Sequence, residues 1–216
     1  MSDAREDVLG RIRRAIGQPV SGRSQDYETV PRFYRQAGTL DLEARLELFR
    51  SRIEHYECGC FHCTRDQLPD AIGRALLARG KRRLILPAGL PAEWLPAAFE
   101  FVRDAGLIYA ELDGCDGAIT GCTIAIAQTG SIVLCHDELE GRRALTLIPD
   151  YHLCVISAEQ VVETVPEGLR HPRVAGAALV TTISGPSATA DIEMTRIKGV
   201  HGPRTLDVVL VDGTRP

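Results

Sequence analysis

The chain lacks the long apolar runs and the strong charge excess that mark membrane and nucleic-acid-binding proteins. No apolar stretch among its 216 residues approaches the roughly 20 residues that a helix needs to cross a bilayer. The first residues are charged and contain no apolar core of a signal peptide. The net charge of −4 gives no reason to expect nucleic acid as a partner. We therefore expect a cytoplasmic protein that binds neither membranes nor nucleic acid.

Motifs that hold common cofactors are also missing. The sequence contains no G-x-G-x-x-G or Walker phosphate loop, no H-E-x-x-H zinc motif and no C-x2-C-x2-C-x3-C iron–sulfur spacing. These absences predict that the chain holds no redox cofactor of its own through a standard site. Its seven cysteines are an odd number with irregular spacing, which fits reduced thiols better than a disulfide framework.

One short segment concentrates possible metal ligands. Cys58, Cys60, His62 and Cys63 lie within six residues of one another. On a strand the first three side chains would point to one face and Cys63 to the other, whereas a tetrahedral site needs four convergent ligands. No second Cys/His pair follows at zinc-finger spacing. We expect a strand of small side chains that binds no metal.

What the sequence does contain is a regular alternation of helical and strand patterns. Residues 1–16 form an amphipathic helix, and residues 17–40 an arm without clear periodicity, which we expect to contribute to docking. The main domain is expected at 41–216. Its first elements are predicted as helices at 42–56, 64–80 and 91–105 and strands at 58–63, 83–87 and 107–112. This order predicts an α/β fold with a mostly parallel open sheet and helices on both faces.

The second half of the chain has shorter elements. Apolar runs at 122–127 and 131–135 flank a Gly-containing turn, which indicates an antiparallel strand pair. An apolar run at 177–183 predicts another strand, and it ends in a loop of turn residues at 184–187. A helical pattern is predicted to begin directly after this loop.

These two turns carry the candidate chemistry. A Gly turn flanked by hydroxyls, with Arg143 nearby, suits a carboxylate or phosphate, although a plain hairpin and a surface arginine explain the same residues. The loop at 184–187 is also open to both interpretations. We expect both turns to face one another across one cleft at the carboxyl ends of the sheet. The candidate ligand-binding residues are Thr129, Gly130, Ser131, Arg143, Ser184, Gly185, Ser187 and Thr189; the candidate catalytic residues are Asp191, Glu193 and His201.

The segments 127–134 and 143–149, His152, and above all 183–193, followed by Gly199–Pro203, resemble the lactate-utilisation (LUD) domain family in its lactate utilisation protein C branch. The resemblance covers roughly residues 41–216. It implies a fold like that of the sugar-phosphate isomerase and CoA-transferase superfamily (NagB/RpiA/CoA transferase-like). It also implies a role in converting L-lactate to pyruvate, alongside partner proteins that carry iron–sulfur clusters.

Three functions remain open on the sequence alone. The first is a non-redox component of a lactate-oxidising system that binds a small carboxylate or phosphate ligand and works with iron–sulfur subunits. The second is a stand-alone isomerase-like or acyl/CoA-transferase-like enzyme that uses Asp191 or Glu193 as a base. The third is a structural adaptor in which the loops form an interface.

Overall fold

The structure is a computed structural model that describes residues 2–16, 29–189, 197–198 and 202–213. The chain divides into two compact units, Met1–Tyr34 and Arg35–Pro216. The first unit contains α1 (Ser2–Ile16), as predicted. No helix in these described ranges is long and apolar enough to cross a membrane.

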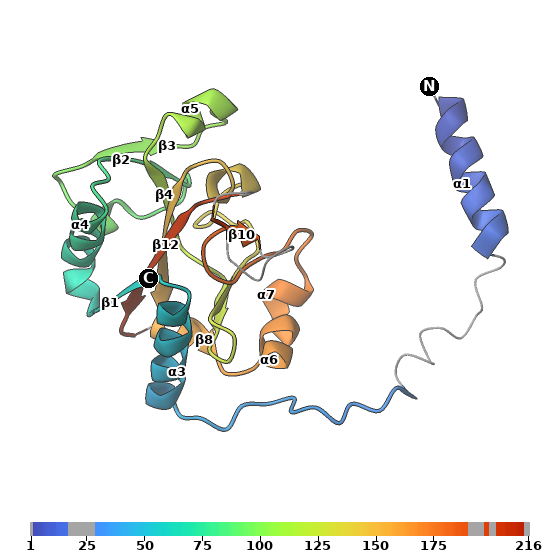
Figure 1. The fold of residues 1–216 in the computed structure, drawn as a ribbon, viewed down its shortest axis with the longest axis horizontal. Helices are drawn as coiled ribbons and strands as arrows, with labels where there is room; N and C mark the ends of the chain where they lie inside the picture. The colour runs from blue at the N-terminus through green and yellow to red at the C-terminus, as the bar shows by residue number, and fades with distance from the viewer. Residues whose placement is uncertain (1, 17–28, 190–196, 199–201, 214–216) are drawn as a thin grey trace. The chain divides into compact units, whose positions relative to one another are not determined.

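A parallel sheet of six strands forms the centre of the second unit (Figure 1). Its order is β1-β12-β7-β4-β2-β3, and every neighbouring pair is parallel. The strands are β1 (Gly59–Cys63), β2 (Arg83–Leu86), β3 (Glu100–Arg103), β4 (Gly117–Thr120), β7 (Tyr151–Ser157) and β12 (Thr205–Val211). The predicted α/β fold with a mostly parallel sheet is confirmed.

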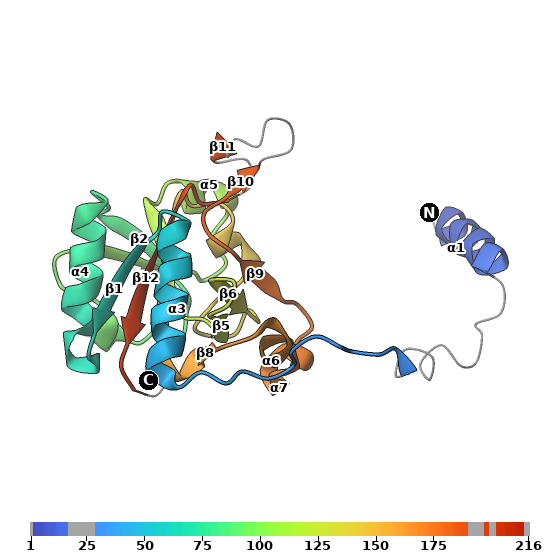
Figure 2. The same ribbon diagram turned by 60° about the horizontal axis from the view of Figure 1, so that its bottom comes forward.

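The buried strands of this sheet have apolar side chains on both faces. Helices cover both faces and remove these side chains from water. Figure 2 shows β1 and β12 between the two longest helices of the unit, α3 (Leu42–His55) and α4 (Leu68–Ala78). On the α4 face, Ile72 and Leu76 pack with Ile119 of the sheet. On the α3 face, Phe49 and Ile53 join a second core.

A smaller sheet of four strands lies on the α3 face, with the order β8-β5-β6-β9. Its strands are β5 (Ile124–Ile126), β6 (Ser131–Leu134), β8 (Val161–Val162) and β9 (Thr181–Ile183). β5 and β6 form the predicted antiparallel pair, and β9 adds to the other side of β6. Both candidate turns therefore follow strands of this smaller sheet and not of the parallel one.

Two predicted elements between β2 and β4 are wrong. The helix expected at 91–105 is a short 3₁₀ turn, η2 (Ala92–Trp94), followed by β3, and the strand expected at 107–112 is mostly the helix α5 (Tyr109–Asp113). Pro96 lies inside the predicted helix and cannot donate a helical hydrogen bond. The parallel pairing of β3 with β2 supplies the backbone partners instead.

The helix predicted after residue 187 is also wrong at its beginning. β10 (Ala188–Thr189) pairs antiparallel with β11 (Ile197–Lys198), as Figure 2 shows. The candidate residues Asp191, Glu193 and His201 lie outside the described residues. The remaining short elements are η1 (Arg65–Gln67), η3 (Arg143–Thr146), η4 (Ala158–Gln160), α6 (Val165–Arg170) and α7 (Pro172–Ala175).

The residues that precede α3 are fixed to the second unit by a buried carboxylate. Glu163, whose side chain is 1% exposed, contacts Arg35 at 2.5 Å and accepts the backbone N–H groups of Thr39 (2.5 Å) and Leu40 (2.7 Å). The hydrogen bond from Leu40 is the main reason that the pKa of Glu163 is lowered. These contacts explain why the compact unit begins at Arg35 and not at the start of α3.

Candidate functional site

Three of the predicted residues meet in a chain of hydroxyl groups. Ile132 of β6 pairs with Ile183 of β9, so the next position on each strand places Ser131 opposite Ser184. Their hydroxyl oxygens are 2.7 Å apart, and the hydroxyl oxygen of Thr129 is 2.8 Å from that of Ser131. Antiparallel pairing in the smaller sheet therefore brings the two candidate turns together.

The glycines of both turns are required by backbone geometry and by Tyr56, which follows α3. Gly130 and Gly185 have φ values of 62° and 82°, a region that disfavours any side chain. A Cβ atom at Gly185 would lie 2.7 Å from the Tyr56 ring. The Tyr56 hydroxyl donates to the Thr129 carbonyl at 3.2 Å. Tyr56 thus fixes the position of the hydroxyl cluster.

Replacing Gly185 by Ala is expected to lower the free energy of unfolding by about 2–3 kcal/mol, because steric overlap with Tyr56 adds to backbone strain. Gly80→Ala is the matched control, since Gly80 has a φ of 63° but no atom within 4 Å of the added Cβ. That control is expected to lose about 1 kcal/mol. Urea unfolding of both variants measures the difference between their free energies of unfolding. Equal losses would show that the Tyr56 ring moves aside at no cost in stability.

The structure places Arg143 apart from this cluster. Arg143 begins η3 and lines a hollow of about 630 Å³. The hollow is lined by Pro87, Ala88, Asp104, Gly106, His136, Asp137, Glu138, Gly141, Arg142, Arg143 and Leu179. His136, which lines the hollow, follows the end of β6, whereas Ser131 of the hydroxyl cluster begins this strand. The four residues of β6, at about 3.3 Å each, separate its two ends by roughly 13 Å.

This hollow lies at the carboxyl ends of β2 and β3, where residues that follow both strands line it. β2 and β4 are neighbours, but the chain leads from β2 outward to β3 and from β4 in the opposite direction to β7. Ligands of open α/β sheets bind at such a switch point. We expect ligands to bind at the carboxyl ends of the sheet, and Arg143 lines a hollow at this edge.

The loop 136–141 closes over the switch point. The backbone N–H of Gly89, after β2, donates to the Glu138 carbonyl at 3.0 Å, and that of Gly121, after β4, to the Leu139 carbonyl at 2.9 Å. Added Cβ atoms at Gly89 and Gly121 would lie 2.7 Å and 3.3 Å from these two side chains. The close approach of the loop thus depends on both glycines.

Two polar side chains, one buried and one half-buried, hold the same loop. Glu140 accepts the Thr123 hydroxyl and the Cys135 backbone N–H, both at 2.6 Å, and its burial raises its pKa. His136 bonds through Nδ1 to the Gly141 carbonyl (2.9 Å) and through Nε2 to the Thr181 hydroxyl (2.8 Å). Since a carbonyl can only accept, the His136 proton is on Nδ1. Neither residue was identified from the sequence.

The two adjacent arginines of the hollow differ in their partners. Arg142 is paired with Asp104 (2.6 Å) and donates to the Leu107 carbonyl (2.5 Å). Toward the described residues, Arg143 donates through Nη1 alone, to the carbonyl and hydroxyl oxygens of Thr146, each at 3.0 Å. Within the described residues no carboxylate lies within ion-pair distance of Arg143, and burial lowers its pKa. Its Nε–Nη2 edge, which can bind a carboxylate through two parallel bonds, has no partner there.

A buried histidine lies beside η3. His152 of β7 is 1% exposed, and its Nε2 is 2.8 Å from the Thr120 hydroxyl. That hydroxyl donates to the Gly121 carbonyl (2.8 Å), so it must accept from His152 and the imidazole proton is on Nε2. Burial, and then the charge of Arg143, lower the pKa of His152 to about 4. His152 is therefore neutral near pH 7 with a lone pair on Nδ1.

Ser187 lies near η3. Its backbone N–H donates to the Pro203 carbonyl at 2.8 Å, and a Cβ atom on Gly202 would lie 3.6 Å from the Ser187 Cβ and 3.9 Å from the Thr146 carbonyl oxygen. The structure thus associates Ser187 with η3 and Ser184 with the hydroxyl cluster. Thr189 belongs to β10.

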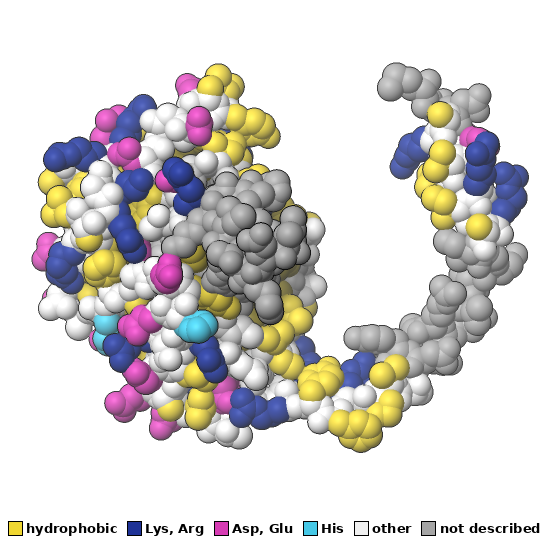
Figure 3. Space-filling view, in the orientation of Figure 1, with side chains coloured by type: hydrophobic (Ala, Val, Ile, Leu, Met, Phe, Trp, Pro, Cys, Tyr) yellow, Lys and Arg dark blue, Asp and Glu magenta, His cyan; other side chains and the backbone are white. Residues whose placement is uncertain are grey.

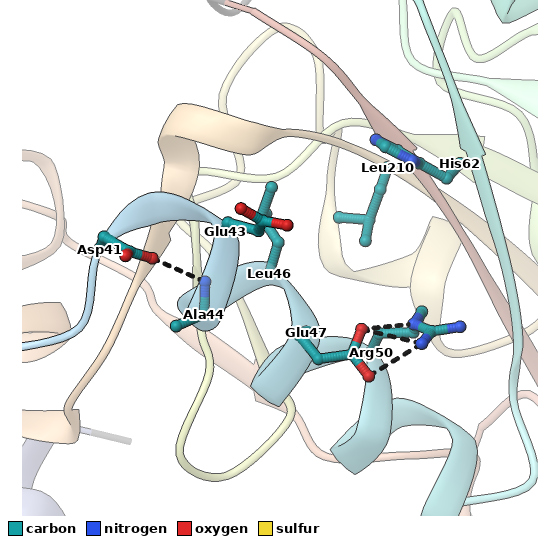
Figure 4. Close-up of a pocket in the computed structure, with 8 residues that line it drawn as sticks. All are labelled: Asp41, Glu43, Ala44, Leu46, Glu47, Arg50, His62 and Leu210. Carbon is teal, nitrogen blue, oxygen red and sulfur yellow. Dashed lines mark hydrogen bonds and ion pairs between the residues drawn. The ribbon is translucent and has the colours of Figure 1, made fainter.

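A second hollow, of about 690 Å³, lies between α3 and the ends of β1 and β12 (Figure 4). Asp41, Glu43 and Glu47 contribute three carboxylates, and Arg50, the one arginine that lines it among the described residues, is paired with Glu47 at 2.8 Å. His62 at its edge contacts Asp212 at 2.7 Å. This excess of negative charge disfavours anions, so the hollow around Arg143 is the better candidate for a carboxylate ligand.

The cysteine segment forms β1, as predicted, and its side chains diverge. Cys60 packs with the core on the α3 face, whereas Cys63 packs with the core on the α4 face. In the part of the chain that the structure describes, no three His, Cys, Asp or Glu side chains are grouped so that they could hold a metal ion.

Comparison with known proteins identifies relatives along most of the chain. The model of the LUD domain matches residues 93–211. The chain is 41% identical to lactate utilization protein C of Deinococcus radiodurans, over 97% of this chain and 96% of the relative. It is 31% identical to lactate utilization protein C of an Exiguobacterium species, over 96% and 95%. The crystal structure of a DUF162 family protein from Deinococcus radiodurans matches with a TM-score of 0.69 and 42% identity, covering 80% of this chain and 99% of that one.

Proposed function

Because the chain belongs to the LUD domain family, we propose that it acts in the utilisation of L-lactate as a non-redox component that binds a small carboxylate. The names of its relatives support the pathway. The ligand class is supported by one observation, the open edge of Arg143. This guanidinium is part of a hollow at the switch point of the sheet and has no carboxylate partner among the described residues.

The charges around the hollow favour a small monoanion. The charge of Arg142 is already balanced by Asp104. Among the described residues that line the hollow, Arg143 is the cation without a carboxylate partner, whereas Asp137 on the rim is paired with Arg173 and Glu138 disfavours ligands with more negative charge. L-Lactate and pyruvate each carry one carboxylate and match this balance better than a sugar phosphate with two negative charges.

Iron–sulfur proteins are proposed as partners that carry out the electron transfer, following the family resemblance. A surface suited to protein contact supports this part of the proposal. Ile108 and Tyr109 at the start of α5 are 66% and 68% exposed, and hydrophobic side chains gather over this helix in Figure 3. Contiguous exposed apolar side chains mark interaction sites.

Replacing Arg143 by Ala is expected to weaken L-lactate and pyruvate binding by about 10- to 100-fold, because a charge-assisted hydrogen bond contributes roughly 1.5–3 kcal/mol. Titration calorimetry on the full chain measures the dissociation constants. Arg65→Ala is the control, since Arg65 is exposed on η1 and does not line the hollow. Absence of binding by the unaltered protein, or equal binding by the Arg143 variant, would contradict the proposal.

A further inference from the structure

We propose that the hydroxyl cluster of Thr129, Ser131 and Ser184, together with Arg52 of α3, binds the phosphate group of a small phosphorylated ligand. The proposed function does not use this cluster, because the hollow around Arg143 lies beyond the other end of β6. The inference therefore adds a second anion site, and it assigns to that site a different class of ligand, a phosphate monoester.

The turn between β5 and β6 packs directly against α3 beside Arg52. A Cβ atom added to Gly130 would lie 2.7 Å from the Cβ atom of Arg52 and 3.3 Å from the Tyr56 ring. Gly130 separates Thr129 from Ser131, so the Arg52 side chain leaves α3 next to two of the three residues of the cluster. The long arginine side chain can therefore bring its guanidinium to a ligand that the hydroxyls bind.

Both ends of the hydroxyl cluster are accessible from solvent. Thr129 at one end is half-buried and Ser184 at the other end is exposed, as is Arg52. Ser131, whose hydroxyl bonds to both, is buried between them. A ligand in solution can therefore reach the two end hydroxyls and the guanidinium without any opening of the core.

The hydrogen bonds within the cluster leave one hydroxyl hydrogen to donate. Three hydroxyls supply three hydrogens, and the two bonds of the cluster, at 2.8 Å and 2.7 Å, use two of them. The third hydrogen is not used within the cluster. The cluster as a whole can therefore donate one hydrogen bond to an oxygen atom of a ligand.

Arg52 supplies the positive charge of this site. Arg50, two residues earlier on α3, is paired with Glu47 at 2.8 Å and with Glu54 at 3.7 Å. Among the residues that the structure describes, no carboxylate lies within ion-pair distance of Arg52. A guanidinium beside hydroxyl donors favours an anion, and its planar fork can bind two oxygens of a phosphate group through parallel bonds.

The number of donors favours phosphate over carboxylate. The guanidinium can hold two oxygens of one ligand group, and the hydroxyl cluster can donate to a third. A phosphate monoester has three terminal oxygens, whereas a carboxylate has two. The site should therefore bind phosphate monoesters more tightly than simple carboxylates.

The test titrates the full-length protein with inorganic phosphate, methyl phosphate and acetate, and follows the backbone amide signals of residues 129–131 and 184 by NMR. Both phosphates are expected to bind there about fivefold more tightly than acetate, the value of one net hydrogen bond. The absence of phosphate-induced shifts at these residues would overturn the inference. Binding of inorganic phosphate without methyl phosphate would overturn the assignment to a phosphorylated ligand.

Substitutions on α3 separate a specific site from general attraction by positive charge. Arg52→Ala is expected to weaken phosphate binding by about tenfold or more, because it removes charge-assisted hydrogen bonds. Arg50→Ala is the matched control on the same helix and is expected to keep the affinity, since Arg50 is already paired with Glu47. Equal weakening in the two variants would reduce the effect to overall charge and would overturn the site.

A double substitution tests the hydroxyl groups separately. Thr129→Val combined with Ser184→Ala removes both accessible ends of the cluster but keeps Arg52. Anion binding should remain, while the preference for phosphate over acetate should fall from about fivefold to about onefold. A full preference retained by the folded double variant would overturn the role of the hydroxyls. If this variant does not fold, the ligand series on the unaltered protein and the Arg52→Ala variant decide.

Discussion

Replacing Arg79 by Ala is expected to lower the free energy of unfolding by about 3–5 kcal/mol, because it strips a buried carboxylate of its charged partner. Asp207 of β12 is 0% exposed, and Arg79 at the end of α4 donates to its two oxygens at 2.7 and 2.8 Å. Asp207 also accepts the Gly59 N–H (2.7 Å) and the Tyr151 hydroxyl (3.1 Å). These bonds connect α4, β1 and β7 to one side chain of β12. Removing Arg79 should therefore destabilise the whole sheet.

Arg83→Ala is the matched control for this prediction. Arg83 also pairs with a carboxylate, Glu100, at 2.8 Å, but both side chains are exposed to solvent. An exposed ion pair of this kind contributes about 0–1 kcal/mol. Urea unfolding monitored by circular dichroism measures both losses. Similar small losses in the two variants would mean that water reaches the Asp207 carboxylate at little cost when Arg79 is removed.

Periodicity and turn chemistry were sufficient to predict most of the fold. The antiparallel runs around Gly130 are strands in the structure, as expected from their apolar patterns. The error at 91–105 has a physical reason. The helical spacing there was real, but pairing of β3 with β2 satisfies the same backbone, and propensity is overridden by such tertiary contacts.

The candidate site was predictable only in part. The hydroxyls of the two turns, Ser131 and Ser184, were expected to meet, and register brings them together. The position of Arg143 was not foreseen, because a sequence does not show that the two turns belong to a separate sheet. His152 and Glu140 were missed as site residues for a related reason. Each lies in an ordinary strand or turn pattern, and only its buried hydrogen-bond partners distinguish it.

The hydroxyl cluster and the hollow around Arg143 lie too far apart to bind one small ligand together. The hydroxyl cluster is held by Tyr56 at one end of β6, whereas the cationic hollow lies beyond the other end. A ligand as small as L-lactate cannot span roughly 13 Å, the length of four strand residues. The hydroxyl cluster is therefore not needed for binding the carboxylate at Arg143. Substitutions of Ser184 should leave lactate affinity unchanged if the proposed site is correct.

The free energy of unfolding is expected to depend strongly on pH through His152. Burial, and then the charge of Arg143, lower the pKa of His152 from 6.5 to about 4. Between these two values the unfolded chain binds a proton at this imidazole and the folded chain does not. The free energy of unfolding therefore rises with pH across this window. The contribution of His152 is complete above pH 6.5 and is lost progressively as the pH falls towards 4.

Comparison with the His152→Gln variant isolates this contribution, because glutamine does not titrate. Between pH 7 and pH 4.5, the unaltered protein is expected to lose about 2–3 kcal/mol relative to the variant. Acidic groups such as Asp150, whose pKa is lowered by its hydrogen bond from Arg204, titrate in both proteins and cancel in the difference. Urea unfolding at a series of pH values gives both curves. Parallel curves would mean that folding does not lower the pKa of His152.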